Sequence, residues 1–441
     1  MRRPRSAAEA AELLRFAAAD GRRLCLRGAG RSYGDAAVHS CGDVLDMTGM
    51  DRIRAFDAER GTLVAEPGVT IEQLWRTVLP RGWWPAVVPG TMRPTLGGCV
   101  AMNIHGKNHY RVGGFGEHVL ELDLALASGE IVTLSASRDP ETFRAVVGGQ
   151  GLLGVVTSVT LGLKRVHSGL IDVDAAAVPS IAALVEEFER RAPHADYLVG
   201  WVDCFDPAGR SVLHEARYLP EGADPSPAAT LAVAAQELPP RIAGVVPRGA
   251  VPIVLGMFAS PGGMSFVNTA KYRSAGIRGA HTFRQPHVQF AFLLDYVPGW
   301  KRIYDPGGLI QYQSFVPREH AVRVHTRLLE LCRERRIVPW LGVYKKHRPC
   351  GFLMTHALDG YSFAMDFPVT AQNRERLWSL VHEMDEVVLA AAGRFYFAKD
   401  LTATAASLQR AYPNLDAFRQ VKRRLDPAGV LTSDLARRLA I

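Results

Sequence analysis

The sequence predicts an α+β protein of two domains, and three features support this fold class. The chain has 441 residues, more than a single hydrophobic core usually holds. Short apolar runs alternate with glycine-rich loops in its first third, whereas strands alternate with longer helices in the middle. We therefore expect one domain over 1–167, a second over 168–390, and a C-terminal segment over 391–441.

The first domain is expected to contain short strands separated by tight turns. Apolar runs bounded by glycine or charged residues predict strands at 23–27 and 44–47. The stretch 61–82 predicts a strand, a Pro-Gly turn and a helix whose N-cap is Thr70. Two apolar runs around "SGE" in 119–135 predict a hairpin.

The second domain is expected to combine strands and helices of ordinary length. Apolar and aromatic runs predict strands at 288–297, 309–317 and 361–369. Amphipathic stretches between and after them predict helices at 318–336 and 371–392. This alternation of element types favours the α+β class for the middle of the chain.

Composition and charge restrict the class of function. Lys and Arg exceed Asp and Glu by eight, but no nucleic-acid-binding motif accompanies this excess, so an anionic substrate, cofactor or membrane surface explains it. The longest apolar stretch, 249–259, is about half of the roughly 20 residues that a membrane span needs, and we interpret it as a buried segment. Six cysteines form no CxxC pair, which is typical of reduced thiols. We expect a cytoplasmic protein with at most peripheral membrane contact and no nucleic-acid partner.

Three glycine-rich loops lie within the first domain: "RGAGRSYGD" at 27–35, "PGTMRPTLGG" at 89–98 and "VGGQGLLG" at 147–154. Glycine lets backbone N–H groups approach an anion closely, and successive N–H groups form a nest for phosphate oxygens. None of the loops has the Rossmann or P-loop pattern. Together they predict a pyrophosphate cradled between several loops.

The stretch "NIHGKNHY" at 103–110 raises the alternative of a metal site, because His105 and His109 are four residues apart. On a helix, this spacing would place both imidazoles on one face. Gly106 disfavours such a helix, and no Asp or Glu in the stretch completes a ligand set. We therefore expect no metal.

The three glycine loops, together with "HGKNH" at 105–109 and "AKD" at 398–400, resemble the vanillyl-alcohol-oxidase type of flavoprotein, which has a PCMH-type FAD-binding domain. Within it, the chain resembles the decaprenylphosphoryl-β-D-ribose 2-oxidases through further motifs, including "YQSFVP", "VYKK", "DFPV" and "DPAGVLTSDLARRL". The resemblance spans nearly the whole chain. It implies a two-domain α+β fold with an antiparallel-sheet substrate (cap) domain and a C-terminal segment that returns to the flavin.

The resemblance also implies which residues hold FAD. They are Gly28, Gly30, Arg31, Ser32, Tyr33, Gly34, Asp35, Gly90, Thr91, Thr95, Gly97, Gly98, Asn103, His105, Gly106, Asn108, Gly149, Gly154, Val155 and Tyr396. Many members of the superfamily bond the flavin covalently through a histidine after the first G-x-G. Arg31 occupies that position here, so we expect non-covalent FAD.

Oxidation of a secondary alcohol requires a hydride acceptor and a group that takes the hydroxyl proton. The resemblance implies that Lys399 is the leading catalytic residue, with His105 and Tyr396 beside the flavin. A lysine acts as a base only where burial or cationic neighbours lower its pKa.

The resemblance further implies a substrate pocket. Its residues are Lys107, Trp201, Gln311, Gln313, Lys345, Ala364 and Lys399. On a strand, Gln311 and Gln313 face one side, where they can hold sugar hydroxyls, and Lys345 suits a phosphate. Ala364 and Ser362 replace a cysteine and an asparagine of the mycobacterial members, which leaves the substrate open.

The expected function is therefore oxidation of a secondary sugar hydroxyl, of the polyprenyl-phosphoryl ribose C2 type, to a ketone by hydride transfer to flavin N5. This would be the first half of an epimerisation in arabinan or cell-wall biosynthesis, completed by an NAD(P)H-dependent ketoreductase. One alternative is a related flavoenzyme acting on a soluble sugar, polyol, nucleoside or secondary-metabolite intermediate. Another is a non-catalytic or metal-binding protein built on the two histidines.

Overall fold

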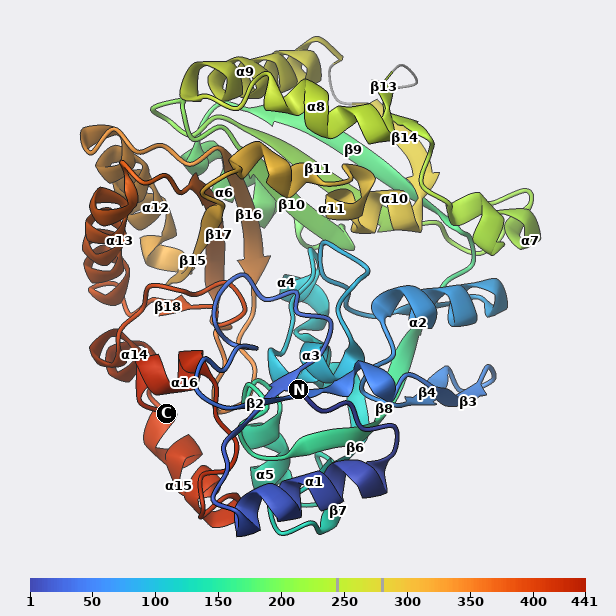
Figure 1. The fold of residues 1–441 in the computed structure, drawn as a ribbon. Helices are drawn as coiled ribbons and strands as arrows, with labels where there is room; N and C mark the ends of the chain where they lie inside the picture. The colour runs from blue at the N-terminus through green and yellow to red at the C-terminus, as the bar shows by residue number, and fades with distance from the viewer. Residues whose placement is uncertain (243–245, 279–280) are drawn as a thin grey trace.

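Two large sheets organise the computed structural model, which describes residues 1–242, 246–278 and 281–441 (Figure 1). The first sheet has the order β3 (Ile53–Asp57), β4 (Thr62–Ala65), β8 (Val155–Arg165), β6 (Val119–Ala125) and β7 (Ile131–Leu134), and β5 (Trp83–Pro85) also pairs with β8. A separate parallel pair joins β1 (Leu24–Arg27) to β2 (Asp43–Asp46). The strands of this part therefore come from the first 165 residues of the chain.

The second sheet has eight strands, and every neighbouring pair in it is antiparallel. Its order is β14 (His281–Pro286), β9 (Leu170–Val178), β11 (Ser211–Tyr218), β10 (Tyr197–Val202), β16 (Leu341–His347), β17 (Gly360–Pro368), β15 (Leu309–Pro317) and β18 (Arg394–Phe395). Helices and antiparallel sheets are thus both present, and the predicted α+β class is confirmed. The domain boundaries at 167 and 390 remain predictions.

The helices fall into three groups along the chain. The first comprises α1 (Ala7–Ala19), α2 (Ile71–Val78), α3 (Leu96–Ala101), α4 (His109–Val112) and α5 (Pro140–Val146). The second comprises α6 (Ile181–Arg191), α7 (Pro227–Thr230), α8 (Val251–Gly256), α9 (Pro261–Arg278), α10 (His287–Ala291), α11 (Leu293–Tyr296), α12 (Arg318–Glu334) and α13 (Arg374–Leu389). The third comprises α14 (Ala405–Ala411), α15 (Leu415–Leu425) and α16 (Asp434–Leu439).

Several local predictions are confirmed. Thr70 caps α2 in a capping box, in which its hydroxyl accepts from the Gln73 N–H and the Gln73 side chain accepts from the Thr70 N–H. The hairpin predicted around "SGE" is the antiparallel pair β6–β7. Helices α12 and α13 lie within the two predicted stretches and pack against strands of the eight-stranded sheet.

The strand predicted at 288–297 is wrong, because the chain forms the short helices α10 and α11 there. A helical turn places Val288 and Phe292 on the same side, and both are buried. Trp84 packs against this turn, with its ring centroid 5.1 Å from that of His287 and 6.1 Å from that of Phe292. The tertiary contact with Trp84 therefore outweighs the local strand preference of an aromatic-rich run.

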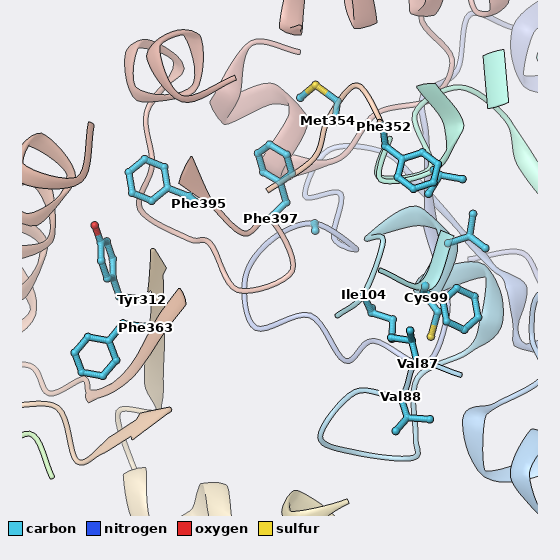
Figure 2. Close-up of a cluster of buried hydrophobic side chains, with 14 of the residues drawn as sticks. Val87, Val88, Cys99, Ile104, Tyr312, Phe352, Met354, Phe363, Phe395 and Phe397 are labelled. Carbon is cyan, nitrogen blue, oxygen red and sulfur yellow. The ribbon is translucent and has the colours of Figure 1, made fainter. Parts of the chain in front are cut away.

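One continuous hydrophobic core connects the parts of the molecule. Figure 2 shows side chains of the first domain, such as Val88 and Ile104, on one side of this cluster. Tyr312 and Phe363 from the eight-stranded sheet lie on the other side, and Phe397 of the C-terminal segment lies between them. The cavity described below lies within this arrangement of the first domain, the eight-stranded sheet and the C-terminal segment.

The C-terminal segment returns to the first domain and is fixed there by an ion pair. Leu24 of β1 pairs with Leu431, so the last strand-like residues extend the β1–β2 pair. Arg438 of α16 binds Asp35 through two hydrogen bonds of 2.9 Å and Asp400 through one of 2.9 Å. Both carboxylates are largely shielded from solvent.

Replacing Arg438 by alanine should destabilise the protein, because it leaves Asp35 and Asp400 as unpaired, poorly solvated charges. We expect the free energy of unfolding, measured by urea titration, to fall by about 3 kcal/mol. Arg437→Ala removes an exposed neighbouring guanidinium and should cost less than about 0.5 kcal/mol. Equal losses in the two variants would contradict a specific role of the Arg438 ion pair.

Candidate functional site

A cavity of about 310 Å³ lies where the glycine-rich loops face the eight-stranded sheet. Of the residues predicted to bind FAD, its wall contains Gly28, Gly30, Arg31, Ser32, Tyr33, Gly90, Thr91, Thr95, Gly97, Gly98, His105, Gly154, Val155 and Tyr396. Of the residues predicted to bind substrate, its wall contains Lys107, Trp201, Gln311, Gln313, Lys345, Ala364 and Lys399. Segments from all parts of the chain thus meet around one space.

The first two glycine loops pack so closely that side chains have no room. A Cβ atom on Gly28 would overlap the Thr95 hydroxyl, and one on Gly97 would lie 2.8 Å from Pro67 Cβ. Gly30 has a φ of +62°, in the left-handed region that favours glycine. Bare backbone therefore forms this side of the cavity, as a site for a pyrophosphate requires.

Gln150 supplies a second observation that fits a bound dinucleotide. It belongs to the third glycine loop and is buried in the cavity wall, with a positive φ of 60°. Neither the Nε2 nor the Oε1 atom of its side chain has a hydrogen-bond partner among the described residues. Buried amides are normally satisfied, so this pair of atoms indicates a polar ligand in the cavity.

Six residues predicted to bind FAD lie behind the cavity wall: Gly34, Asp35, Asn103, Gly106, Asn108 and Gly149. A side chain at Gly34 would overlap the Asp400 carbonyl, and Asp35 binds Arg438. Asn103 Oδ1 accepts from the Gly116 N–H at 2.9 Å. Asn108 Nδ2 donates to the Ala86 carbonyl at 2.8 Å. The contacts of these residues hold the loops and the C-terminal segment in place.

Among the described residues, four lysines line the cavity, whereas Asp366 is the one carboxylate in its wall. Burial lowers the pKa of Lys107 to about 7, aided by the nearby Lys345. Burial also lowers the pKa of Lys345 and of Lys271 to about 8. The fourth is Lys399. This excess of poorly solvated cations favours an anionic ligand, which would restore the charge balance.

Lys399 lies between an aromatic ring and Asp366. Its Nζ atom is 3.5 Å from the centroid of the Tyr33 ring. Burial lowers the pKa of Lys399 below the usual lysine value, Lys345 adds to this effect, and Asp366 opposes it. Burial raises the pKa of Asp366, although Gln311 donates a hydrogen bond to its carboxylate. The lowered pKa gives Lys399 the neutral form that a base needs.

His105 is held in a buried network with the sheet. Gln313 Nε2 lies 3.1 Å from His105 Nε2 and 3.4 Å from Ser362 Oγ, which in turn lies 2.7 Å from His347 Nε2. Burial and the nearby Lys345 hold the pKa of His105 well below its usual value, so the ring is neutral. An amide nitrogen only donates, so His105 Nε2 accepts and its proton resides on Nδ1.

The two histidines of "HGKNH" lie in different local structures. His105 lies in the loop before α4, and His109 is the first residue of that helix. Their ring centroids are 6.3 Å apart in an edge-to-face arrangement. In the described part of the chain, no three His, Cys, Asp or Glu side chains are grouped so as to hold a metal ion.

Three residues of the site were not predicted from the sequence. Lys271 comes from α9, where no helix was expected, and its Nζ lies 3.8 Å from the ring centroid of Trp201. Asp366 belongs to the quoted motif "DFPV", so the motif was the available signal. Gln150 lies in the third glycine loop, and its role depends on the lack of a partner, which a sequence does not reveal.

Comparisons with known proteins find similarity over nearly the whole chain. Residues 1–135 match the family model of an FAD binding domain, and residues 364–439 match that of D-arabinono-1,4-lactone oxidase. The decaprenylphosphoryl-β-D-ribose oxidase of Mycolicibacterium smegmatis is 31% identical over 97% of this chain and 91% of its own length. The L-gulono-1,4-lactone dehydrogenase of Mycobacterium tuberculosis is 24% identical over 99% and 95%. Cytokinin dehydrogenase 6 of Oryza sativa is 34% identical over 36% and 32%.

Replacing Gln150 by alanine should weaken flavin binding, because a buried amide then no longer meets the ligand. We expect about a tenfold rise in the dissociation constant for FAD, measured by titrating the flavin-free protein. Gln372→Ala, in an exposed turn, is the matched control and should bind FAD normally. Unchanged affinity in the Gln150 variant would show that its amide does not contact the cofactor.

Proposed function

The chain belongs to the family of FAD-dependent oxidoreductases that includes the decaprenylphosphoryl-β-D-ribose oxidase of Mycolicibacterium smegmatis, and from this premise we propose that it oxidises the C2 hydroxyl of a polyprenyl-phosphoryl ribose to a ketone. Three lysines besides Lys399 line a cavity with one carboxylate among its described wall residues, and this set carries the proposal. A neutral sugar has no charge to balance these cations. A phosphoryl sugar carries negative charge on its phosphate, which would balance them.

The sheet supports recognition of the sugar. Gln311 and Gln313 alternate on β15 and both reach the cavity wall, whereas Tyr312 between them is buried on the other side. Gln311 is fixed by Asp366, and Gln313 by Ser362 and His105. Amides held in this way present defined donors and acceptors to hydroxyl groups.

Bound FAD supplies the acceptor for the hydride that leaves the alcohol carbon. The loops at Gly28 and Gly97 and the Gln150 amide would hold it, and Arg31 in the wall offers no nucleophile, so we propose non-covalent binding. Lys399 in its neutral form accepts the hydroxyl proton, which leaves a ketone once hydride has departed. His105 is neutral, and its Nδ1–H is free among the described residues.

A ketone at C2 gives epimerisation only if a second enzyme returns hydride to the opposite face. We therefore propose an NAD(P)H-dependent ketoreductase as the functional partner. The chemistry requires this class of reaction, because oxidation followed by reduction on the other face inverts one carbon without changing the overall oxidation state.

Lys399→Ala should retain bound flavin but lose turnover by at least about a hundredfold, because the variant lacks the proposed proton acceptor. In the parent enzyme, kcat/KM should rise with pH through a pKa below that of free lysine, since neutral Lys399 is the active form. Asp366 raises the pKa of Lys399, so Asp366→Asn should shift the rise of kcat/KM to lower pH. Steady-state profiles across pH measure both effects, and full turnover in the Lys399 variant would remove it from the mechanism.

The variant Lys345→Ala tests whether Lys345 binds the phosphate of the substrate. We expect about a tenfold rise in KM for polyprenyl-phosphoryl ribose, through loss of one charge-assisted hydrogen bond, and little change for an uncharged ribose glycoside. Lys346→Ala is the matched control, because Lys346 is the next residue on β16 but binds Glu189 instead. Flavin bleaching without oxygen reports the reaction. Bleaching by a soluble glycoside, while polyprenyl-phosphoryl ribose leaves the flavin oxidised, would favour the soluble-substrate alternative.

A further inference from the structure

Most of the excess positive charge of the chain comes from one continuous stretch. Residues 238–294 contain six Lys or Arg residues and no Asp or Glu, in a chain whose net charge is +8. Helices α8 and α9 belong to this stretch, and Figure 1 places both at the end of the molecule farthest from α1. Helices α8 and α9 contain no Asp or Glu, so the surface that these two helices expose is complementary to an anionic partner.

Helix α9 has two different faces. Met264, Asn268 and Lys271 follow at helical spacing on the inner face, where Met264 and Asn268 are buried and Lys271 lines the cavity. Phe266 and Ile277 are eleven residues apart, close to three full turns, and so lie on the outer face. The outer face of a surface helix is normally polar, but here it carries large apolar side chains.

The exposed apolar residues continue beyond α9. Half of the large hydrophobic side chains that are exposed in the described residues belong to this stretch, with exposed fractions of 73% for Ile253, 73% for Met257, 63% for Phe266, 87% for Ile277 and 51% for Leu293. Phe258, just after α8, stacks on Phe266 with ring centroids 6.0 Å apart. Arg273, also exposed, lies between Phe266 and Ile277 on the outer face. We call this set the α8–α9 face.

The α8–α9 face continues into the cavity. Leu293 is exposed and also lines the cavity wall, as its neighbour Leu294 does. Lys271 reaches the cavity from the inner side of the same helix that carries Phe266 and Ile277. Leu293 of α11 and Lys271 of α9 therefore connect the α8–α9 face to the cationic cavity.

We propose that the α8–α9 face docks on an anionic lipid bilayer, so that a lipid-linked sugar phosphate passes from the membrane surface into the cavity. The inference rests on the proposed function for its substrate. Large apolar side chains that project from a helix beside arginine, without acidic neighbours, enter the headgroup region of a bilayer and bind anionic lipids there. Among the described residues, no helix is long and apolar enough to span a membrane, so the contact is peripheral.

Vesicle sedimentation tests the docking. The flavin-loaded protein should sediment with vesicles of phosphatidylcholine and phosphatidylglycerol, more weakly with phosphatidylcholine alone, and less at high salt. Phe266→Ser/Ile277→Ser should lower the partition coefficient about tenfold, and Arg273→Glu should weaken binding to the anionic vesicles only. Equal sedimentation of the parent and the double variant would overturn the proposal.

The matched control is Phe16→Ser/Leu120→Ser, which removes exposed apolar side chains elsewhere and should leave vesicle binding unchanged. Flavin content and thermal unfolding should be unchanged in both double variants, because all four side chains are exposed. Membrane docking would be overturned if the parent protein does not sediment with vesicles but forms a dimer in gel filtration that Phe266→Ser/Ile277→Ser abolishes. The α8–α9 face would then bind a second copy of the chain. Vesicle binding without oxidation of polyprenyl-phosphoryl ribose would instead overturn the proposed function.

Discussion

The ion pair of Arg438 with Asp35 and Asp400 joins the two ends of the chain, and the position of Lys399 depends on it. The Tyr33 N–H donates to the Ala398 carbonyl at 2.8 Å, so a backbone hydrogen bond also joins the first glycine loop to the C-terminal segment. Lys399, between Ala398 and Asp400, is thereby held over the Tyr33 ring. A residue supplied by the last tenth of the chain thus becomes part of a wall built by the first tenth.

Burial of Lys399 against the first loop has an electrostatic consequence. Removing an ammonium group from water disfavours its charged form, and further lysines around the same cavity add to that effect. Asp366 is the one carboxylate that the described residues contribute to the wall, and burial raises its pKa too, so it compensates only part of the positive charge. An anionic substrate would complete this balance, and the exposed Arg273 of the α8–α9 face would attract the same charge toward this end of the molecule.

The sequence predicted those parts of the site that depend on local geometry or on motifs. Alternation along a strand placed Gln311 and Gln313 on one face, and closely spaced glycines marked three loops of the wall. Asp366 lies opposite Gln311 through the register of β15 and β17, which a single sequence does not reveal. Lys271 depends on where α9 packs. In "RSYGD", Gly34 and Asp35 hold the C-terminal segment, and a motif does not distinguish residues that touch a ligand from residues that hold the ligand's neighbours.

The two departures from the family pattern have different physical effects. Ser362 is buried and bonded to His347 and Gln313, so it preserves the network that orients Gln313 and His105. Ala364 pairs with Gln313 across the sheet and lines the cavity, where a methyl group takes less space than a cysteine side chain. The change at position 364 therefore enlarges the space beside the glutamines without altering its charge. Under the proposed function, we therefore expect differences in substrate relative to the mycobacterial members to concern the size of the sugar and not its charge.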